Sequence, residues 1–352
     1  MPGMLYKIKS IVTRKLEGVD HFHYYLCRQL KGGGMEIKMK IAIVDSGFDS
    51  SMKLENNKIV FKKNYTKSGG DSDTNDFHGH GTCITKQIDM LVSDCNIYIL
   101  KVFDRNLEAN FLLLYKALVD IYEIGVDIVN LSLGLESNLY VNQMTEICDM
   151  LKKKNCILVT TASNSGEKSY LLDLESVIKV IGGKGIVSNN LYYYDSQFYI
   201  KSYPRFLPWK DNTMVFLGGN SFSVPLVIPL IVQCMKYHNQ NCENILRWIK
   251  SRAIQVNNIE KIIRPFDISN EECKDYFLGN IIDSYLVEKI QYNRKQNMLF
   301  AYEKFSPFEI ADILIEISNL LEVNIKVEDF YYWNLYYRNN LVNRFHELIW
   351  GV

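Results

Sequence analysis

Short apolar runs that end at polar residues recur along the first half of the chain, and each is long enough to be a strand. Five of these runs are Ile37 to Val44, Asn96 to Val102, Val126 to Leu133, Cys156 to Thr160 and Val177 to Ile181. Apolar runs of this length, flanked by turn residues, are typical of strands that are buried within a sheet.

Helical patterns separate several of these runs. Apolar residues fall on one face of a helix between Asn110 and Ile124, and Tyr140 to Lys154 predicts a further helix. Strands that alternate with helices predict an α/β fold with a mostly parallel sheet. Because ligands bind at the carboxyl ends of the strands in such sheets, the polar motifs directly after the runs are the candidate functional sites.

Charge and cysteine content narrow the class of protein. The 352 residues contain 40 Lys and Arg against 40 Asp and Glu, so the formal net charge is zero. This balance argues against a nucleic-acid partner, which requires a basic surplus. The eight cysteines form no CxxC pair and show no regular spacing, so they predict neither a zinc site nor a disulfide framework.

The chain shows no pattern for secretion or for membrane insertion. Met1 to Lys40 carries scattered charges and no uninterrupted apolar segment. The apolar stretch Val224 to Met235 is broken by two prolines and predicts a core helix rather than a membrane span. We therefore expect a soluble, cytoplasmic protein without a membrane partner.

Two of the candidate motifs contain an acid and a base. Asp45 directly follows the first run, and a carboxylate buried there needs a partner such as an imidazole. Taken alone, such an Asp is more often a helix cap or a nucleotide or metal ligand. His80 lies between Gly79 and Gly81, which allow a close backbone approach where a helix opens. His78 is placed awkwardly for sharing a metal with His80, and we expect it to be a solvent-exposed bystander.

Two later motifs add an amide and a hydroxyl. Asn164 follows the fourth run in a Ser- and Gly-rich turn, where it is either a turn former or a hydrogen-bond donor to a developing oxyanion. Ser221 follows two glycines at the predicted start of a helix, which exposes its hydroxyl. Ser223 is the competing nucleophile, but it falls within the helix start.

Together these motifs resemble the subtilisin-like serine proteases, the subtilase family. The resemblance covers about Ile37 to Val256 and rests on five motifs in the family's order: Asp-Ser-Gly at Asp45, His-Gly-Thr at His80, Ser-Leu-Gly at Ser132 to Gly134, the Asn164 turn, and Gly-x-Ser-x-x-x-Pro at Gly219 to Pro225. It implies a three-layer α/β/α fold and a peptide or protein substrate.

The resemblance also implies roles for individual residues. Ser221 would be the nucleophile, His80 the general base, and Asp45 the group that orients and stabilises the imidazole. Asn164 would bind the oxyanion together with the Ser221 N–H group. The residues Ser132, Leu133 and Gly134 would pair with the extended substrate as a strand. No cofactor or metal is implied, but calcium dependence stays open because no calcium loop is recognisable.

The chain departs from the family pattern at several positions near these motifs. Asn220 replaces the usual Thr, and Phe222 replaces the usual Met and should narrow the leaving-group side of the cleft. Ser223 stands where Ala is common, and Ser163 replaces the Gly before the oxyanion Asn. Cys83 stands where the family often has a second His, and we expect it to confer sensitivity to thiol reagents.

The pattern divides the chain into four parts: an N-terminal extension (1–36), a peptidase domain (37–258), a linker (259–274) and a helical accessory domain (275–352). Helices are expected at Asn280 to Gln291, Pro307 to Leu321 and Asn339 to Ile349. This order is similar to an acyl or peptidyl carrier protein, but Pro307 occupies the position of the attachment Ser, so prosthetic loading is not expected. An exposed part of this region would suit a protein partner.

We therefore expect a serine endopeptidase of restricted specificity, for example one that removes the leader of a ribosomally made peptide. The alternative is a catalytically silent scaffold of the same fold that binds a peptide or protein. A thioester carrier role for the C-terminal region would require a Ser at the attachment position, which Pro307 occupies.

Overall fold

The computed structural model describes residues 38–351, apart from residues 106, 108–109, 136–138, 164–167, 184–185, 187–189, 239–240, 263–269, 291–304 and 331. Its centre is a nine-stranded sheet in the order β11-β7-β8-β6-β5-β4-β1-β3-β2. The strands are β1 (Met39–Asp45), β2 (Lys58–Asn64), β3 (Cys95–Lys101), β4 (Ile128–Leu131), β5 (Ile157–Thr160), β6 (Val177–Gly183), β7 (Tyr192–Tyr194), β8 (Gln197–Lys201) and β11 (Ile254–Gln255). Within this sheet, β7 and β8 pair antiparallel and the other pairings are parallel.

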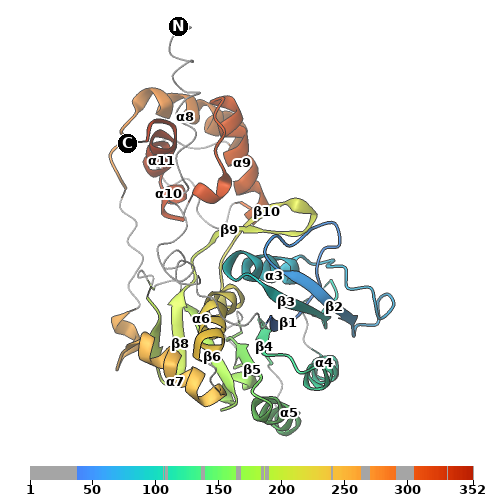
Figure 1. Ribbon diagram of the computed structural model, residues 1–352. Coiled ribbons are helices and arrows are strands. Elements are labelled where there is room, and N and C mark those ends of the chain that lie inside the picture. Colours follow the sequence, from blue (N-terminus) through green and yellow to red (C-terminus); the bar gives the residue numbers. More distant parts are fainter. Residues whose placement is uncertain are drawn as a thin grey trace.

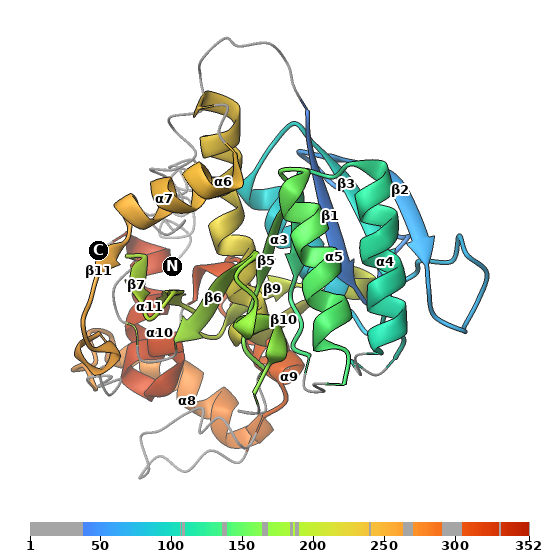
Figure 2. The same cartoon turned by 90° about the horizontal axis from the view of Figure 1, so that it is seen from below.

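Helices cover both faces of the sheet. On one face, α4 (Phe111–Ile124) and α5 (Val141–Lys153) lie side by side, as Figure 2 shows. The other face is covered by α3 (His80–Leu91), α6 (Val224–His238) and α7 (Cys242–Arg252). This arrangement confirms the expected α/β class and its three-layer α/β/α architecture (Figure 1).

The side chains of β1 alternate between two hydrophobic cores. Ile41 and Ile43 pack with α3 and α6, whereas Ala42 and Val44 pack with α4 and α5. None of these four side chains is more than 1% exposed. Successive side chains of a strand point to opposite faces, so a central strand covered on both sides must be apolar throughout. This explains why the apolar run Ile41 to Val44, directly before Asp45, forms a strand.

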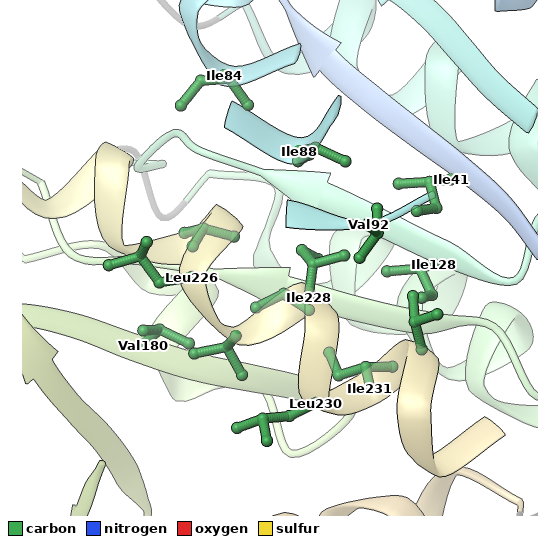
Figure 3. Close-up of a cluster of buried hydrophobic side chains, with 14 of the residues drawn as sticks. Ile41, Ile84, Ile88, Val92, Ile128, Val180, Leu226, Ile228, Leu230 and Ile231 are labelled. Carbon is green, nitrogen blue, oxygen red and sulfur yellow. The ribbon is translucent and has the colours of Figure 1, made fainter. Parts of the chain in front are cut away.

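The core between the sheet and its α3/α6 layer fixes two helices that matter for the site. Figure 3 shows Ile84 and Ile88 of α3 in one cluster with Ile228 and Ile231 of α6. All four side chains are fully buried. Burying a side chain of this size contributes about 1.5–3 kcal/mol, so both helices are firmly attached to the sheet. His80 begins α3, and Ser221 lies in the short 3₁₀ turn directly before α6.

Some elements differ from the sequence-based expectations. β2 was not predicted, because it is an edge strand with several lysines and no continuous apolar run. A separate two-stranded hairpin, β9 (Arg205–Pro208) with β10 (Met214–Leu217), was also not predicted. Helix α7 begins at Cys242, because the Asn241 side chain accepts a hydrogen bond from Asn244 N–H and caps it.

The C-terminal region forms helices close to the expected positions. They are α8 (Tyr276–Ile290), α9 (Pro307–Leu320), α10 (Tyr332–Tyr336) and α11 (Arg338–Trp350). Ser306 caps α9 in a reciprocal capping box with Glu309, with Pro307 in the first turn. A doubly hydrogen-bonded ion pair between Arg338 and Asp283 connects α11 to α8. The resemblance to a carrier protein stays a prediction.

These helices share their core with the β9–β10 hairpin. Phe206 and Phe216 of the hairpin lie in the same buried cluster as Phe330 and Phe345 of the C-terminal region. Figure 1 shows the hairpin between the helices and the sheet. The expected linker falls partly on residues 263–269, outside the described part of the chain, and the division into domains stays a prediction. Within the described residues, no helix is long and apolar enough to cross a membrane.

Candidate active site

Asp45 lies at the carboxyl end of β1, and its side chain is buried at 1% exposure. Its Oδ1 accepts hydrogen bonds from Ser46 N–H (2.8 Å) and from the Ser46 hydroxyl (3.3 Å). The same oxygen is 2.8 Å from Nδ1 of His80. A buried carboxylate is costly unless it is hydrogen-bonded. These three contacts satisfy Oδ1, whereas Oδ2 is buried and has no hydrogen-bond partner among the described residues. The imidazole expected from the sequence is therefore beside the carboxylate.

His80 is held in place because the start of α3 is fixed at several points. Asp76 Oδ2 accepts hydrogen bonds from the Thr82 N–H and hydroxyl at 2.8 and 2.7 Å, and its Oδ1 accepts the Gly79 N–H at 2.7 Å. The Gly81 N–H donates to the Ser46 hydroxyl at 2.9 Å, which connects α3 to the end of β1. The start of the helix is therefore rigidly placed against Asp45.

Gly79 is required at its position for two reasons. Its φ of 110° lies in the left-handed region, which side chains disfavour. A Cβ there would also come within 2.2 Å of Nε1 of Trp209. The indole of Trp209 can therefore lie directly against the backbone that precedes His80.

Two opposing effects act on the pKa of His80. Burial disfavours the imidazolium ion, but the negative charge of Asp45 and its hydrogen bond outweigh burial. The result is a pKa above the ordinary value for histidine. The pair is thus arranged to stabilise a proton taken up by His80.

His78 is not the solvent-exposed bystander expected from the sequence. It is half-buried, with its ring centroid 5.9 Å from that of Trp209 and 6.3 Å from that of His80. Burial and the nearby His80 lower its pKa, which favours the neutral ring. The expectation was wrong because Trp209, which is distant in the sequence, packs against the His78 ring.

Ser221 lies in a 3₁₀ turn, Asn220–Ser223, that follows Gly218 and Gly219. Gly219 has a φ of 141°, and its carbonyl accepts a hydrogen bond from the Ser202 hydroxyl at 2.7 Å. The Ser132 hydroxyl donates to the Ser221 carbonyl at 2.9 Å. These bonds fix the backbone on both sides of the candidate nucleophile.

Asn220, which departs from the family pattern, connects the turn to two neighbouring segments. Its Nδ2 donates to the Ser163 carbonyl at 3.2 Å, and its Oδ1 accepts the Gly182 N–H at 3.1 Å. The Ser223 hydroxyl donates back to the Asn220 carbonyl and is fully buried. Ser223 therefore points into the protein, which removes it as a competing nucleophile.

Ser221 and His80 line the same cleft, which has a volume of about 1050 Å³. Ser132, Leu133 and Gly134, which directly follow β4, line it too. The Ser132 hydroxyl is used internally, so this residue can offer only its backbone. The cleft also has an apolar wall, made of Phe103, Leu107, Phe111, Leu112, Leu135 and Tyr140.

Three aromatic side chains among the lining residues of the cleft pack closely against other rings. Phe222 lies 5.4 Å from the His80 ring between centroids and is 5% exposed. Phe111 and Tyr140 stack on each other at 4.2 Å between centroids. Asn164, the expected oxyanion donor, lies outside the described residues, although Ala162 and Ser163 before it line the cleft.

Sequence reasoning missed several residues that build this site. Asp76 could have been found as a helix cap, since an Asp shortly before a helix start is a common capping signal. Ser202 and Trp209 gave no local signal, because they reach the site only through the fold. Among the described residues, no group of three or more His, Cys, Asp or Glu side chains is placed to hold a metal ion.

The environment of Cys83 changes the expectation of thiol sensitivity. Its side chain is 0% exposed, and burial raises the pKa of the thiol well above its usual value. We therefore expect a mercurial to label Cys83 in the native protein at least ~100-fold more slowly than a free thiol, with no early loss of activity. Mass spectrometry of native and urea-unfolded protein after timed treatment tests this. Rapid labelling of native Cys83 would contradict it.

Comparisons with known proteins agree with the fold. A model of the subtilase family matches residues 36–200, which include Asp45 and His80 and end before Ser221. A lanthipeptide protease structure is 16% identical with a TM-score of 0.51, covering 59% of this chain and 78% of that chain. A cold-adapted subtilisin-like serine proteinase is 14% identical with a TM-score of 0.51, covering 62% and 82%. A search of curated proteins found no match.

The chain therefore contains a domain of the subtilase family, and its sheet and helices form the subtilisin-like fold. This confirms the family resemblance drawn from the five motifs.

Proposed function

We propose that the protein is a serine endopeptidase in which Asp45, His80 and Ser221 form the catalytic triad. The observation that carries this proposal is the hydrogen bond that His80 Nδ1 donates to buried Asp45, at the cleft that also contains Ser221. A base that is oriented by a carboxylate and shares a cleft with a hydroxyl is the arrangement required for nucleophilic catalysis.

The proposed reaction begins when Ser221 Oγ attacks the carbonyl carbon of a peptide and His80 takes the hydroxyl proton. Asp45 keeps the His80 Nδ1 proton in place and stabilises the imidazolium ion. His80 then donates the proton to the leaving amine, and an acyl-enzyme forms on Ser221. A water molecule, deprotonated by His80, hydrolyses this ester and restores the hydroxyl.

The developing oxyanion would be bound by the Asn164 side chain and the Ser221 backbone N–H group. The carbonyl of Ser163, directly before Asn164, accepts a hydrogen bond from the Asn220 side chain. The backbone that leads to Asn164 is therefore tied to the residue that precedes Ser221. One such donor contributes about 3–4 kcal/mol to transition-state stabilisation in this type of site.

The substrate would bind in extended form along Ser132, Leu133 and Gly134. Backbone hydrogen bonds from a strand give affinity that is independent of sequence, whereas side-chain pockets give specificity. The apolar wall that includes Phe111 and Tyr140 favours a substrate with a large apolar side chain on the acyl side. Phe222 and Trp209 restrict the other end of the cleft.

We further propose that the enzyme cuts a limited set of peptides, with the leader of a ribosomally made peptide as the leading candidate. The bulky side chains that line the cleft support restricted specificity. A lanthipeptide protease is among the proteins that share this fold. Cytoplasmic location stays a proposal, as does the absence of membrane and nucleic-acid partners.

Digestion of a mixed peptide library, with products identified by mass spectrometry, tests both the endopeptidase assignment and its restricted specificity. We expect cleavage at a few related sequences with an apolar residue before the cut, and little degradation of casein. Indiscriminate casein degradation would contradict restricted specificity but not the serine protease assignment. Absence of any cleavage by folded protein would contradict the assignment itself.

A further inference from the structure

The β9–β10 hairpin has two faces that serve different parts of the molecule. Phe206 and Phe216 are buried against the C-terminal helices. Leu207 and Val215, the alternate positions, are buried in the core with α3 and α6. Side chains of a strand alternate between faces, so this pattern is expected for a hairpin held between two layers. Since an isolated two-stranded hairpin is marginally stable in water, its packing against these layers stabilises it.

Arg205, the first residue of β9, lies two positions before Leu207 and reaches the candidate active site from this hairpin. Its Nη2 donates to Gln87 Oε1 at 2.7 Å and makes a longer contact of 3.4 Å with the Phe222 carbonyl. Gln87 lies in α3, seven residues after His80, and is 4% exposed. Phe222 directly follows Ser221. One guanidinium group thus contacts both the helix that begins with His80 and the turn that contains Ser221.

We propose that Arg205 is a positioning residue for the proposed hydrolysis, and that the C-terminal helices hold the hairpin that presents it. Its guanidinium group sets the separation of His80 and Ser221 by contacting the Gln87 side chain in the helix of His80 and the Phe222 backbone carbonyl in the turn of Ser221. A lysine has one compact ammonium group and cannot reproduce the planar set of donors. This inference rests on the proposed function, because it assigns Arg205 no chemistry of its own.

The effect should fall on the chemical step rather than on substrate binding. Arg205 is not among the residues that line the cleft, so its loss leaves the substrate contacts in place. A displacement of about 1 Å between reacting groups can reduce a rate by about 100-fold. We therefore expect a change in kcat with little change in KM.

The experiment compares Arg205→Met, Arg205→Lys and the control Arg252→Met in the full-length protein. Arg252 is exposed and lies over the Trp248 ring, away from the cleft. For a peptide identified from the library, we expect Arg205→Met to lower kcat by about 10- to 100-fold with KM within about threefold. Arg205→Lys should restore only part of this loss, and Arg252→Met should behave as the wild type.

Gln87→Met provides a second route if Arg205→Met does not fold. This variant replaces Gln87, whose Oε1 accepts the hydrogen bond from Arg205, by an apolar side chain of similar size. The same fall in kcat is expected. Wild-type kcat in a folded variant of either residue would overturn the inference while leaving the proposed function intact. A wild-type protein that neither cleaves peptides nor reacts with a fluorophosphonate would overturn both.

Discussion

Ser221→Ala is expected to abolish peptide hydrolysis, with a loss in kcat of about 10⁶-fold, as found when the nucleophile of a subtilisin-type triad is removed. The alanine side chain cannot form the acyl-enzyme, and the oxyanion site alone leaves only a small residual acceleration. Folding should be unaffected, because the bonds that fix this turn run through the Ser221 carbonyl and its neighbours. Steady-state assays with a peptide from the library provide the measurement.

Ser223→Ala is the matched control for this prediction. Its hydroxyl is buried and donates to the Asn220 carbonyl, so its loss should cost about 1 kcal/mol of stability. We expect its hydrolysis rate to stay within about tenfold of the wild type, since the hydroxyl makes no contribution to the reaction itself. If Ser223→Ala were inactive and Ser221→Ala active, the assignment of the nucleophile would be wrong.

Asp45→Asn is expected to lower kcat by about 10⁴-fold. The amide can donate as well as accept, so it can hold His80 in the wrong tautomer, and it lacks the charge that stabilises the imidazolium ion. Asp120→Asn is a suitable control, because Asp120 lies on α4 and pairs with Lys63. A variant at Asp45 that keeps wild-type activity would contradict its role.

The pH dependence follows from the same pair. His80 must be neutral to act as a base, so kcat/KM falls as the pH drops below the pKa of His80. Asp45 raises this pKa, so the acid limb of the wild-type profile should lie at a higher pH than for an ordinary histidine. Asp45→Asn removes the charge and leaves burial, so the limb should move to lower pH. If the acid limb does not move in Asp45→Asn, a group other than His80 must cause the fall in kcat/KM at low pH.

The elements that the sequence predicts best are the buried ones. β1, β3, β5 and β6 are apolar runs because a parallel sheet covered on both faces demands them. The edge strand β2 carries Lys58, Lys62 and Lys63, so it lacks the continuous apolar run by which the buried strands are recognised. The β9–β10 hairpin begins after Pro204 and contains Pro208 and Trp209, and its burial comes from elements distant in the chain.

The residues of the candidate site likewise differ in how well the local sequence predicts them. Asp45, His80 and Ser221 stand in local motifs at strand and helix ends, so their positions could be read from the chain. His78, by contrast, was misplaced because its environment is set by Trp209, and Trp209 in turn contacts Phe308 of α9. No local pattern indicates that the C-terminal helices and the hairpin share one core. Contacts between residues that are so distant in the sequence become visible only in the folded structure.

Reaction with a fluorophosphonate serine-hydrolase probe tests the central claim most directly, because it reports an activated serine without knowledge of the substrate. We predict stoichiometric labelling of the folded wild-type protein, with the modified peptide containing Ser221, and no labelling of Ser221→Ala. Failure of the folded wild type to react, or equal labelling of Ser221→Ala, would contradict a catalytic Ser221. A silent scaffold of the subtilase fold would then be the better account.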